Sequence, residues 1–204
     1  TGLVGTETLT VTATGAFANA NVGDGKTVNI TNITLGDGTN GGKASNYVLA
    51  ATGNQATTTA NITAASGTVA AANRPTAKDD LEYNGTAQTL VTAPAGGLPD
   101  GYDKILYSVD GGAWSETLPS ETDADTYTVT YKYQDSTGNH SEITDASCTL
   151  DVTIAPKSVT VTEGITASNK TYDGSTSATL SGSGAVVTGL VGTETLTVTA
   201  TGAF

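Results

Sequence analysis

Apolar and polar residues alternate along several stretches of the chain, whereas no stretch keeps apolar residues at helical spacing. In residues 8–14 (TLTVTAT), apolar side chains alternate with threonine. The same period of two recurs in residues 126–133 (TYTVTYKY) and 148–154 (CTLDVTI). Alternation of this kind places one set of side chains on each face of a β-strand. The pattern predicts an all-β protein.

The phase of the alternation changes once within a single predicted strand. Val28 and Ile30 lie in one phase, whereas Ile33 and Leu35 lie in the opposite phase. One extra residue near Thr31 and Asn32 accounts for the change. Because an inserted residue moves the following side chains to the other face, the sequence predicts a β-bulge or a bend between sheets here.

One stretch of the sequence occurs twice. Residues 1–17 read TGLVGTETLTVTATGAF, and residues 188–204 repeat them without a difference. Because residue 188 begins the second copy of the stretch that starts at residue 1, the repeat has a period of 187 residues. A period of this kind indicates a window from a longer tandem array, in which copied units act as spacers or as binding arrays.

The repeat and the turn signals predict the domain organisation. Residues 1–65 form a strand series, residues 66–75 form an unpatterned linker made flexible by Gly67, residues 76–156 form a second module, and residues 157–204 open a third segment. Because the third segment runs into a copy of the first, these two are expected to be the earlier and later parts of one β module. That module is split between the two ends of the chain, so we expect two β-sandwich modules.

The middle module has the clearest predicted core. Trp114, the tyrosine-rich stripe of residues 127–133 and the last strand, residues 148–154, are expected to pack together. The only cysteine, Cys148, lies in phase with the apolar residues of that strand, so we expect a buried, unreactive thiol. The only histidine, His140, is expected in an exposed turn.

Charge and composition restrict the classes of partner. The net charge is −12 and the pI is about 4.1, so no basic patch is available for nucleic acid. A single cysteine excludes an internal disulfide, and this composition is typical of exported bacterial proteins. From this composition we expect an extracellular segment at the cell surface, and from the absence of a transmembrane run we expect no membrane insertion of this segment.

Several motifs carry a resemblance to known families. KTYDGST at residues 170–176, with supporting stretches at 7–31 and 46–64, resembles the YDG domain of bacterial surface-protein arrays. LEYNGTAQTLV at 81–91, YSVDGGAWSETLP at 107–119 and DADTYTVTYKY at 123–133 resemble the MBG family of bacterial Ig-like domains. The two resemblances imply β-sandwiches in long exported adhesins or stalks, without enzymatic activity.

Two candidate sites concern cations and crosslinks. Asp79 and Asp80 follow the predicted linker and are the best candidates for calcium at a domain joint, although turn acids commonly make local hydrogen bonds instead. No other cofactor is indicated. Lys170 and Asn61 are a candidate isopeptide pair across the split module, which requires a buried lysine and a carboxylic acid kept protonated by burial. Lysines in such strands are usually exposed.

The leading functional hypothesis is a structural repeat of a bacterial surface fibre or adhesin stalk. Its partners are neighbouring copies of the repeat, which could complete the split module end to end by β-strand addition, or the chain could close on itself. The alternative is an adhesin module that binds a host glycan or protein. Tyr102 and Trp114, together with Tyr83, would then form a sugar platform if exposed, with core packing as the competing role.

Overall fold

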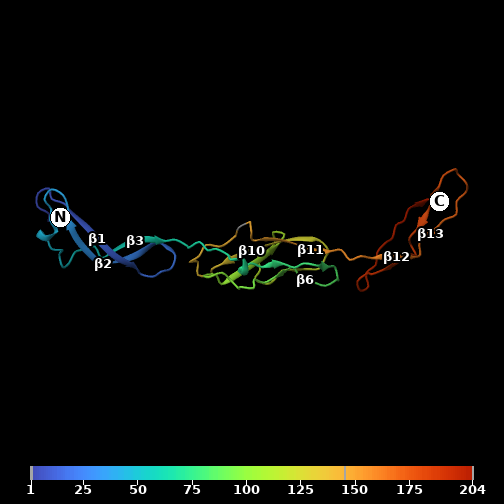
Figure 1. The fold of residues 1–204 in the computed structure, drawn as a ribbon, viewed down its shortest axis with the longest axis horizontal. Helices are drawn as coiled ribbons and strands as arrows, with labels where there is room; N and C mark the ends of the chain where they lie inside the picture. The colour runs from blue at the N-terminus through green and yellow to red at the C-terminus, as the bar shows by residue number, and fades with distance from the viewer. Residues whose placement is uncertain (1, 145, 204) are drawn as a thin grey trace. The chain divides into compact units, whose positions relative to one another are not determined.

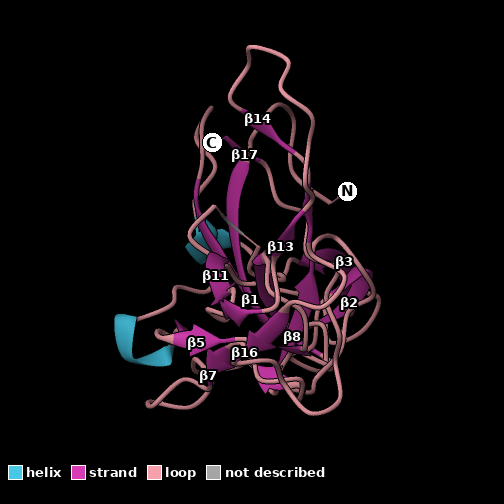
Figure 2. Ribbon diagram, turned by 90° about the vertical axis from the view of Figure 1, so that its right-hand side faces the viewer, coloured by secondary structure: helices cyan, strands magenta, loops and turns pink. Residues whose placement is uncertain are grey.

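The computed structural model describes residues 2–144 and 146–203, and the chain is all-β (Figure 1). Two short 3-10 turns, Ala44–Asn46 and Ala71–Asn73, interrupt the strands and loops (Figure 2). The chain divides into two units. The first comprises the residues up to Gly67 with the loop Asp135–Ser141, and the second comprises Thr68–Gln134 with the residues from Glu142 onward. Each unit is described separately below.

The first unit is built on a three-stranded antiparallel sheet. Its strand order is β1-β2-β3, with β1 at Leu9–Phe17, β2 at Gly23–Asp37 and β3 at Thr57–Ile62. Thr14 pairs with Asn32 and Gly15 pairs with Ile30, so Thr31 is the extra residue of a β-bulge. The bulge predicted from the phase change is therefore confirmed.

The two faces of this sheet differ in chemistry. Val11 lies opposite Leu35, whereas Thr12 lies opposite Thr34 and the two threonine hydroxyls are hydrogen-bonded. The apolar face has no covering layer, because Val11 is 63% exposed and the only residue classed as buried in residues 2–67 is Gly42. This unit thus contains a paired sheet without a hydrophobic core.

The middle module belongs to the second unit and is a β-sandwich. One layer is a four-stranded sheet of order β5-β11-β10-β8, and the other consists of two short ladders, β4–β7 and β6–β9. The bounds are β4 Thr76–Ala77, β5 Leu81–Glu82, β6 Gln88–Thr89, β7 Val91–Thr92, β8 Lys104–Val109, β9 Ser120–Glu121, β10 Thr126–Gln134 and β11 Thr149–Ala155.

The core of the middle module follows the predicted alternation. The tyrosine-rich strand β10 turns every second side chain inward, and β11 does the same, which confirms both predicted core faces. Leu90 and Val91 close the core from the other layer, each with no exposed surface. The inward residues of the two long strands that are fully buried or nearly so are Val129, Tyr131, Tyr133, Val152 and Ile154, and Cys148 lies beside them.

Trp114 departs from the predicted core. It is 43% exposed, and the Lys132 ammonium lies over its ring at 4.7 Å from the centroid. The reason is strand parity. Ser115 pairs with Tyr107 in an isolated bridge, and Lys132 occupies an outward position of β10, so Trp114 packs on the outer face of the sheet.

The segment before the middle module is held against that module by side chains. The Asn73 amide donates to the carbonyls of Gly96 (3.0 Å) and Gly97 (3.2 Å), and the buried Tyr133 hydroxyl donates to the Asn73 carbonyl. Arg74 donates to the Ser147 hydroxyl at 2.7 Å. Residues 68–75, which the sequence indicates as part of a flexible linker, therefore contribute to the framework of the sandwich.

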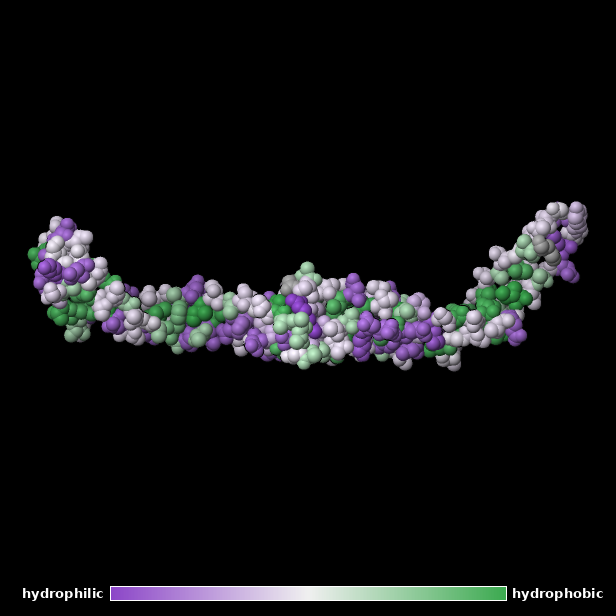
Figure 3. Space-filling model, viewed as in Figure 1, coloured by the Kyte–Doolittle hydropathy of each residue, from purple (hydrophilic) through white to green (hydrophobic). Residues whose placement is uncertain are grey.

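The last segment consists of three small ladders. They pair β12 (Thr160–Glu163) with β16 (Val186–Thr188), β13 (Thr166–Ala167) with β15 (Leu180–Ser181), and β14 (Ser177–Ala178) with β17 (Gly202–Ala203). No described residue from 158 to 203 is buried. Figure 3 shows apolar surface on this segment. Val159, Val161 and Leu196 are among its exposed apolar residues. Like the first unit, it has strands but no core.

Candidate functional site

The two copies of the repeated stretch make different contacts, and these contacts define the candidate site. In the first copy, the Glu7 carboxylate accepts a hydrogen bond from the Tyr47 hydroxyl. The Val4 amide donates to the same hydroxyl at 3.1 Å. The strand that follows, β1, pairs along its whole length with β2. The first copy is thus held by residues that follow it in the sequence.

The first copy also borders an open hollow of about 550 Å³. Leu3, Leu9 and Val11 line it from the repeated stretch. Val48 and Leu49, from the segment after the 3-10 turn, line it from the other side. Val48 is 91% exposed, so apolar side chains are uncovered here, although more of the surface of the hollow is polar than apolar.

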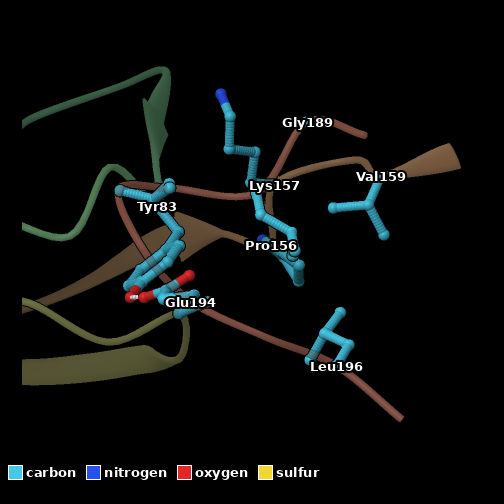
Figure 4. Close-up of a pocket in the computed structure, with 10 residues that line it drawn as sticks. Tyr83, Pro156, Lys157, Val159, Gly189, Glu194 and Leu196 are labelled. Atoms are coloured by element: carbon cyan, nitrogen blue, oxygen red, sulfur yellow. Dashed lines mark hydrogen bonds between the residues drawn. The ribbon is translucent and has the colours of Figure 1, made fainter. Parts of the chain in front are cut away.

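The second copy of the stretch lies against the middle module. There, a hollow of about 330 Å³ is lined by Leu190 and Leu196 of the copy and by Pro156 and Val159 of the preceding segment (Figure 4). The Glu194 carboxylate accepts a hydrogen bond from the Tyr83 hydroxyl, as the dashed line in Figure 4 marks. The second copy is thus held by residues that precede it.

The joint itself contains one further ion pair. The Lys157 ammonium lies 3.0 Å from the Glu82 carboxylate, and both side chains are largely solvated. An exposed pair of this kind contributes little to stability. Pro156 fixes the backbone beside it and lines the hollow. The joint is therefore defined mainly by the Tyr83–Glu194 hydrogen bond and by apolar contact.

Corresponding glutamates raise the pKa of two tyrosines. The hydrogen bond to Glu7 is the main cause that raises the pKa of Tyr47 above its ordinary value, and the hydrogen bond to Glu194 does the same for Tyr83. The neutral hydroxyl donates to the carboxylate, whereas a phenolate would be repelled by it. Each tyrosine therefore stays a hydrogen-bond donor throughout the neutral pH range.

The backbone of the repeated stretch also has two different partners. Gly15 and Ala16 of the first copy pair with Ile30 and Asn29 of β2. The corresponding Gly202 and Ala203 pair with Ala178 and Ser177 of β14. One sequence therefore forms a ladder with a later segment in one copy and with an earlier segment in the other.

The loop between β10 and β11 is grouped with the first unit and is hydrogen-bonded within it. The Asn139 side-chain oxygen accepts from the Val22 amide at 2.9 Å, and the Asn139 carbonyl accepts from the Ala65 amide at 2.9 Å. His140 Nδ1 lies 2.9 Å from the Asp135 carboxylate, and the ring is 31% exposed. His140 is thus partnered within the loop instead of lying free in an exposed turn.

Hydrogen bonds hold the Asp135 carboxylate in its ionised form. The bond from the Thr137 hydroxyl is the largest cause that keeps the pKa of Asp135 well below its ordinary value, and the contact with His140 is the next. Both donors stabilise the carboxylate anion. The loop therefore keeps its conformation at neutral pH through one charged acceptor.

The calcium candidates lie at the start of the middle module. Asp79 and Asp80 are exposed residues directly before β5. Asp80 adopts a left-handed conformation with a φ of 57°, which asparagine and aspartate tolerate better than most residues. Within residues 2–144 and 146–203, no three His, Cys, Asp or Glu side chains gather into a metal-binding group. The two aspartates therefore form a turn, and calcium binding to them stays a prediction.

The predicted sugar platform is not assembled on the surface. Tyr102 is 7% exposed and its ring meets the ring of Tyr133 edge to face, at a centroid distance of 6.4 Å. Trp114 lies on the outer face with Lys132 over it. Of the two residues, only Trp114 offers a ring surface to solvent.

The isopeptide candidates have local partners. The Lys170 ammonium lies 2.8 Å from the Asp173 carboxylate and donates to the Ser175 hydroxyl at 2.9 Å. The Asn61 side-chain oxygen accepts from the Gly25 amide at 2.8 Å. Lys170 and Asn61 belong to different units, so their pairing stays a prediction.

Comparison with known proteins identifies the split module. The family model of the YDG domain matches residues 1–60 and 155–204. The chain belongs to the YDG domain family. No curated protein and no solved structure matches it. The matched ranges contain both copies of the repeated stretch and the first hollow, whereas the second hollow is lined partly by Tyr83 and Ala124 of the middle module, which lie outside them. No described helix is long and apolar enough to span a bilayer.

Sequence reasoning missed the two glutamate–tyrosine pairs and the role of Asn139. The duplication shows that Glu7 and Glu194 are equivalent, but nothing in the sequence indicates that Tyr47 is the partner of one and Tyr83 that of the other. Asn139 is one of many asparagines in turns, and only its contacts distinguish it. The repeated stretch was the available signal for the site.

Proposed function

We propose that the chain is a structural repeat unit of a long extracellular bacterial surface fibre or adhesin stalk, with a mechanical role and no enzymatic activity. The observation that carries the proposal is the return of residues 1–17 at positions 188–204, after the middle module. A chain that continues in this way alternates YDG modules with middle modules. Units that are copied end to end project whatever lies at their tip away from the cell.

The joint between the middle module and the second copy supports this role. Four residues, 156–159, separate β11 from β12, and the Tyr83–Glu194 hydrogen bond links the middle module to the segment beyond them. A short joint with a proline and a hydrogen bond restricts bending, whereas a long glycine-rich linker would permit it. The resemblance of the middle module to the MBG family of bacterial Ig-like domains also supports an exported array, whose partners are neighbouring copies of the repeat.

The experiment compares proteins that carry one, two and four repeats by small-angle X-ray scattering. The proposal expects the maximum dimension to grow in proportion to the number of repeats, while the cross-section stays constant. A four-repeat protein with the radius of gyration of a compact globule would refute it. The matched control is a four-repeat protein with Tyr83→Phe and Glu194→Gln in each repeat, in which a larger spread of dimensions is expected.

An adhesin module that binds a host glycan or protein is the alternative function. The observation that favours it is the exposed ring surface of Trp114, because aromatic faces bind the apolar faces of sugars. A glycan that bound the four-repeat protein and was lost with Trp114→Ala, but not with Tyr172→Ala, would support this function. Tyr172 is the matched control because it is 93% exposed.

A further inference from the structure

We propose that the free edge of β1 binds residues 158–182 of a second copy of this chain, with Ala178 opposite Gly15 and Ser177 opposite Ala16. The inference rests on the proposed function, since an array places such copies beside one another. It adds the strand, the edge and the register of the contact. Three observations carry it: identical sequence in the two copies, complementary backbone edges, and leucines that have different apolar neighbours in the two copies.

Sequence identity provides the register. Gly15 and Ala16 are the same residues of the repeat as Gly202 and Ala203. In the second copy, Gly202 pairs with Ala178 and Ala203 pairs with Ser177. A backbone that forms this antiparallel ladder in one copy can form it in the other, provided that the required edge is free.

The contacts of β1 show which edge is occupied. The Thr8 amide donates to the Thr39 carbonyl and the Ala18 amide donates to the Thr27 carbonyl, each at 3.1 Å. Even-numbered residues therefore direct their backbone groups toward β2. Since successive residues of a strand point their amides and carbonyls to opposite edges, the odd-numbered residues of β1 serve the other edge. No strand of the described chain pairs there.

The second copy uses that other edge. Val198 corresponds to the odd-numbered Val11. Its carbonyl oxygen lies so close to Gly182 that a Cβ on this glycine would be 2.3 Å from it. The segment from Ser177 to Gly182 therefore lies along the edge that is free in β1. Because β2 and this segment occupy opposite edges of the same strand, the strand can hold both at once.

The apolar side chains at the two hollows differ in the same way, although only the second hollow is mainly apolar. Leu3 and Leu9 line the hollow of the first copy with Val48 and Leu49, and their equivalents, Leu190 and Leu196, line the second hollow with Val159. In the first copy, Leu3 and Leu9 thus have apolar neighbours that follow them in the sequence. In the second copy, the equivalent Leu190 and Leu196 have an apolar neighbour that precedes them. A second copy that brings residue 159 to the first hollow would cover surface that is now exposed. Burial of apolar surface supplies the driving force.

Charge does not prevent the contact. The net charge of −12 repels two copies at long range, but this repulsion is screened at physiological ionic strength. The residues that form the ladder (Gly15, Ala16, Ser177 and Ala178) are all uncharged. Association is therefore expected to strengthen as salt is added.

The test is a disulfide trap between two chains. One chain carries Ala16→Cys and the other carries Ser177→Cys. Ala16 directs its backbone groups toward β2, so its pair with Ser177 is non-hydrogen-bonded, with Cα atoms about 4.5 Å apart. That separation lies within the range that a disulfide accepts. Cys148 stays in both chains because it is fully buried.

The matched control shifts the register by two residues. Ala16→Cys is mixed with Thr179→Cys, whose Cα atom would lie about 7–8 Å away on the diagonal. The proposal expects heterodimers from the in-register mixture and loss of most of this product from the shifted mixture. Equal trapping of both pairs, or trapping of neither, would overturn it. An internal crosslink in a chain with both Ala16→Cys and Ser177→Cys, without dimer, would also overturn it, because the segment would then dock on its own chain.

Hydrogen exchange on the unmodified chain gives an independent measurement. The amides of Val11, Ala13 and Gly15 serve the free edge and are expected to gain protection as the protein concentration rises. The amides of Thr12 and Ala16 already face β2, so their protection is expected to change less. A change of equal size in both sets, or no change in either, would contradict the assigned edge.

The two proposals can fail separately. If the multi-repeat protein is elongated but the register-specific trap fails, the stalk remains and the pairing is wrong. If the trap works in the 204-residue chain but the multi-repeat protein is compact, the pairing remains and the stalk is wrong. The scattering measurement and the disulfide trap therefore test different statements.

Discussion

Two tyrosines of the middle module predict opposite responses to the same substitution. Tyr133 is fully buried and its hydroxyl donates to the Asn73 carbonyl. Tyr107 is 3% exposed, and its buried hydroxyl has no hydrogen-bond partner among the described residues. Replacement of each tyrosine by phenylalanine keeps the ring and removes only the hydroxyl. We expect Tyr133→Phe to destabilise the module and Tyr107→Phe to leave it unchanged or stabilise it.

The magnitudes follow from the hydrogen-bonding state of each hydroxyl. Tyr133→Phe loses one hydrogen bond and leaves the Asn73 carbonyl without this donor, which costs roughly 1–2 kcal/mol. Tyr107→Phe removes an unsatisfied buried polar group, which relieves a desolvation penalty of up to about 1 kcal/mol. Tyr133→Ala also loses the ring contacts with Tyr102 and Tyr131, and costs roughly 3–5 kcal/mol.

Urea unfolding followed by tryptophan fluorescence measures these differences. The chain has one tryptophan, Trp114, which lies in the middle module, so its signal reports on that module. With a urea dependence of about 2 kcal/mol per molar, Tyr133→Phe should lower the midpoint by roughly 0.5–1 M. Tyr172→Phe is the surface control, because this side chain is 93% exposed.

Equal destabilisation by Tyr133→Phe and Tyr107→Phe would refute the reasoning, because it would show that the loss of stability does not depend on whether the hydroxyl is hydrogen-bonded. If the urea midpoint of Tyr133→Phe equals that of the unmodified chain, the hydrogen bond from the Tyr133 hydroxyl to the Asn73 carbonyl contributes nothing to the stability of the module. Amide exchange at residues 68–75 separates local from global effects. Those amides should lose protection in Tyr133→Phe before the amides of β10 do.

Three further predictions concern single groups. Glu194→Gln should lower the pKa of Tyr83 toward its ordinary value of 10.0, measured by NMR titration of the ring, because the carboxylate acceptor is what raises it; an unchanged pKa would contradict the pairing. The depressed pKa of Asp135 means that its stabilising effect is complete above the ordinary value of 3.8 and is lost as the pH falls toward the lower folded-state value. Carboxyl NMR should therefore find Asp135 still ionised at pH 3.8, and half-protonation there would contradict the hydrogen-bonded geometry. Cys148 should react with an aromatic disulfide reagent only after unfolding, so rapid labelling of the native chain would show that its site opens.

The strands of the middle module were largely predictable from the sequence because their side chains alternate between a core and solvent. β10 and β11 keep period two over their full length, and burial follows it. The bulge at Thr31 was predictable for the same reason, since a phase change has a single geometric meaning. The alternation shows which side chains lie on each face of a strand, and the apolar face is the one that packs into the core.

Trp114 shows where that reasoning fails. Its hydrophobic character predicted a core position. It follows a turn, however, and the face of the sheet on which it lies depends on which residue after the turn first pairs with β8. Ser115 is that residue, and Trp114 is left on the outer face, where Lys132 covers part of the ring. Turn geometry sets the parity of the following residues, and apolar character alone does not reveal it.

Asn73 and Arg74 show a second limit of sequence reasoning. Nothing periodic marks residues 68–75, so they were indicated as a linker. They are held to the sandwich by side-chain hydrogen bonds to loop carbonyls and to Ser147. Such contacts depend on loops that meet only after folding, and no local pattern encodes them.

The repeated stretch shows that strand formation here is decided by the partner and not by the sequence of the strand. Residues 9–17 form a nine-residue strand beside β2, whereas among the described residues of the identical second copy only Gly202–Ala203 form a strand. Intrinsic β-propensity is the same in both, so the difference lies in the neighbouring segment.

Among the described residues, neither part of the YDG module buries a hydrophobic core, so neither offsets the conformational entropy of ordering its own chain by apolar burial. If the proposed pairing holds, the two sets of neighbours around the same leucines would together enclose a core. The stability of one YDG module would then depend on the sequence of the adjacent repeat. An array built on this plan would be stabilised by the interfaces between successive copies.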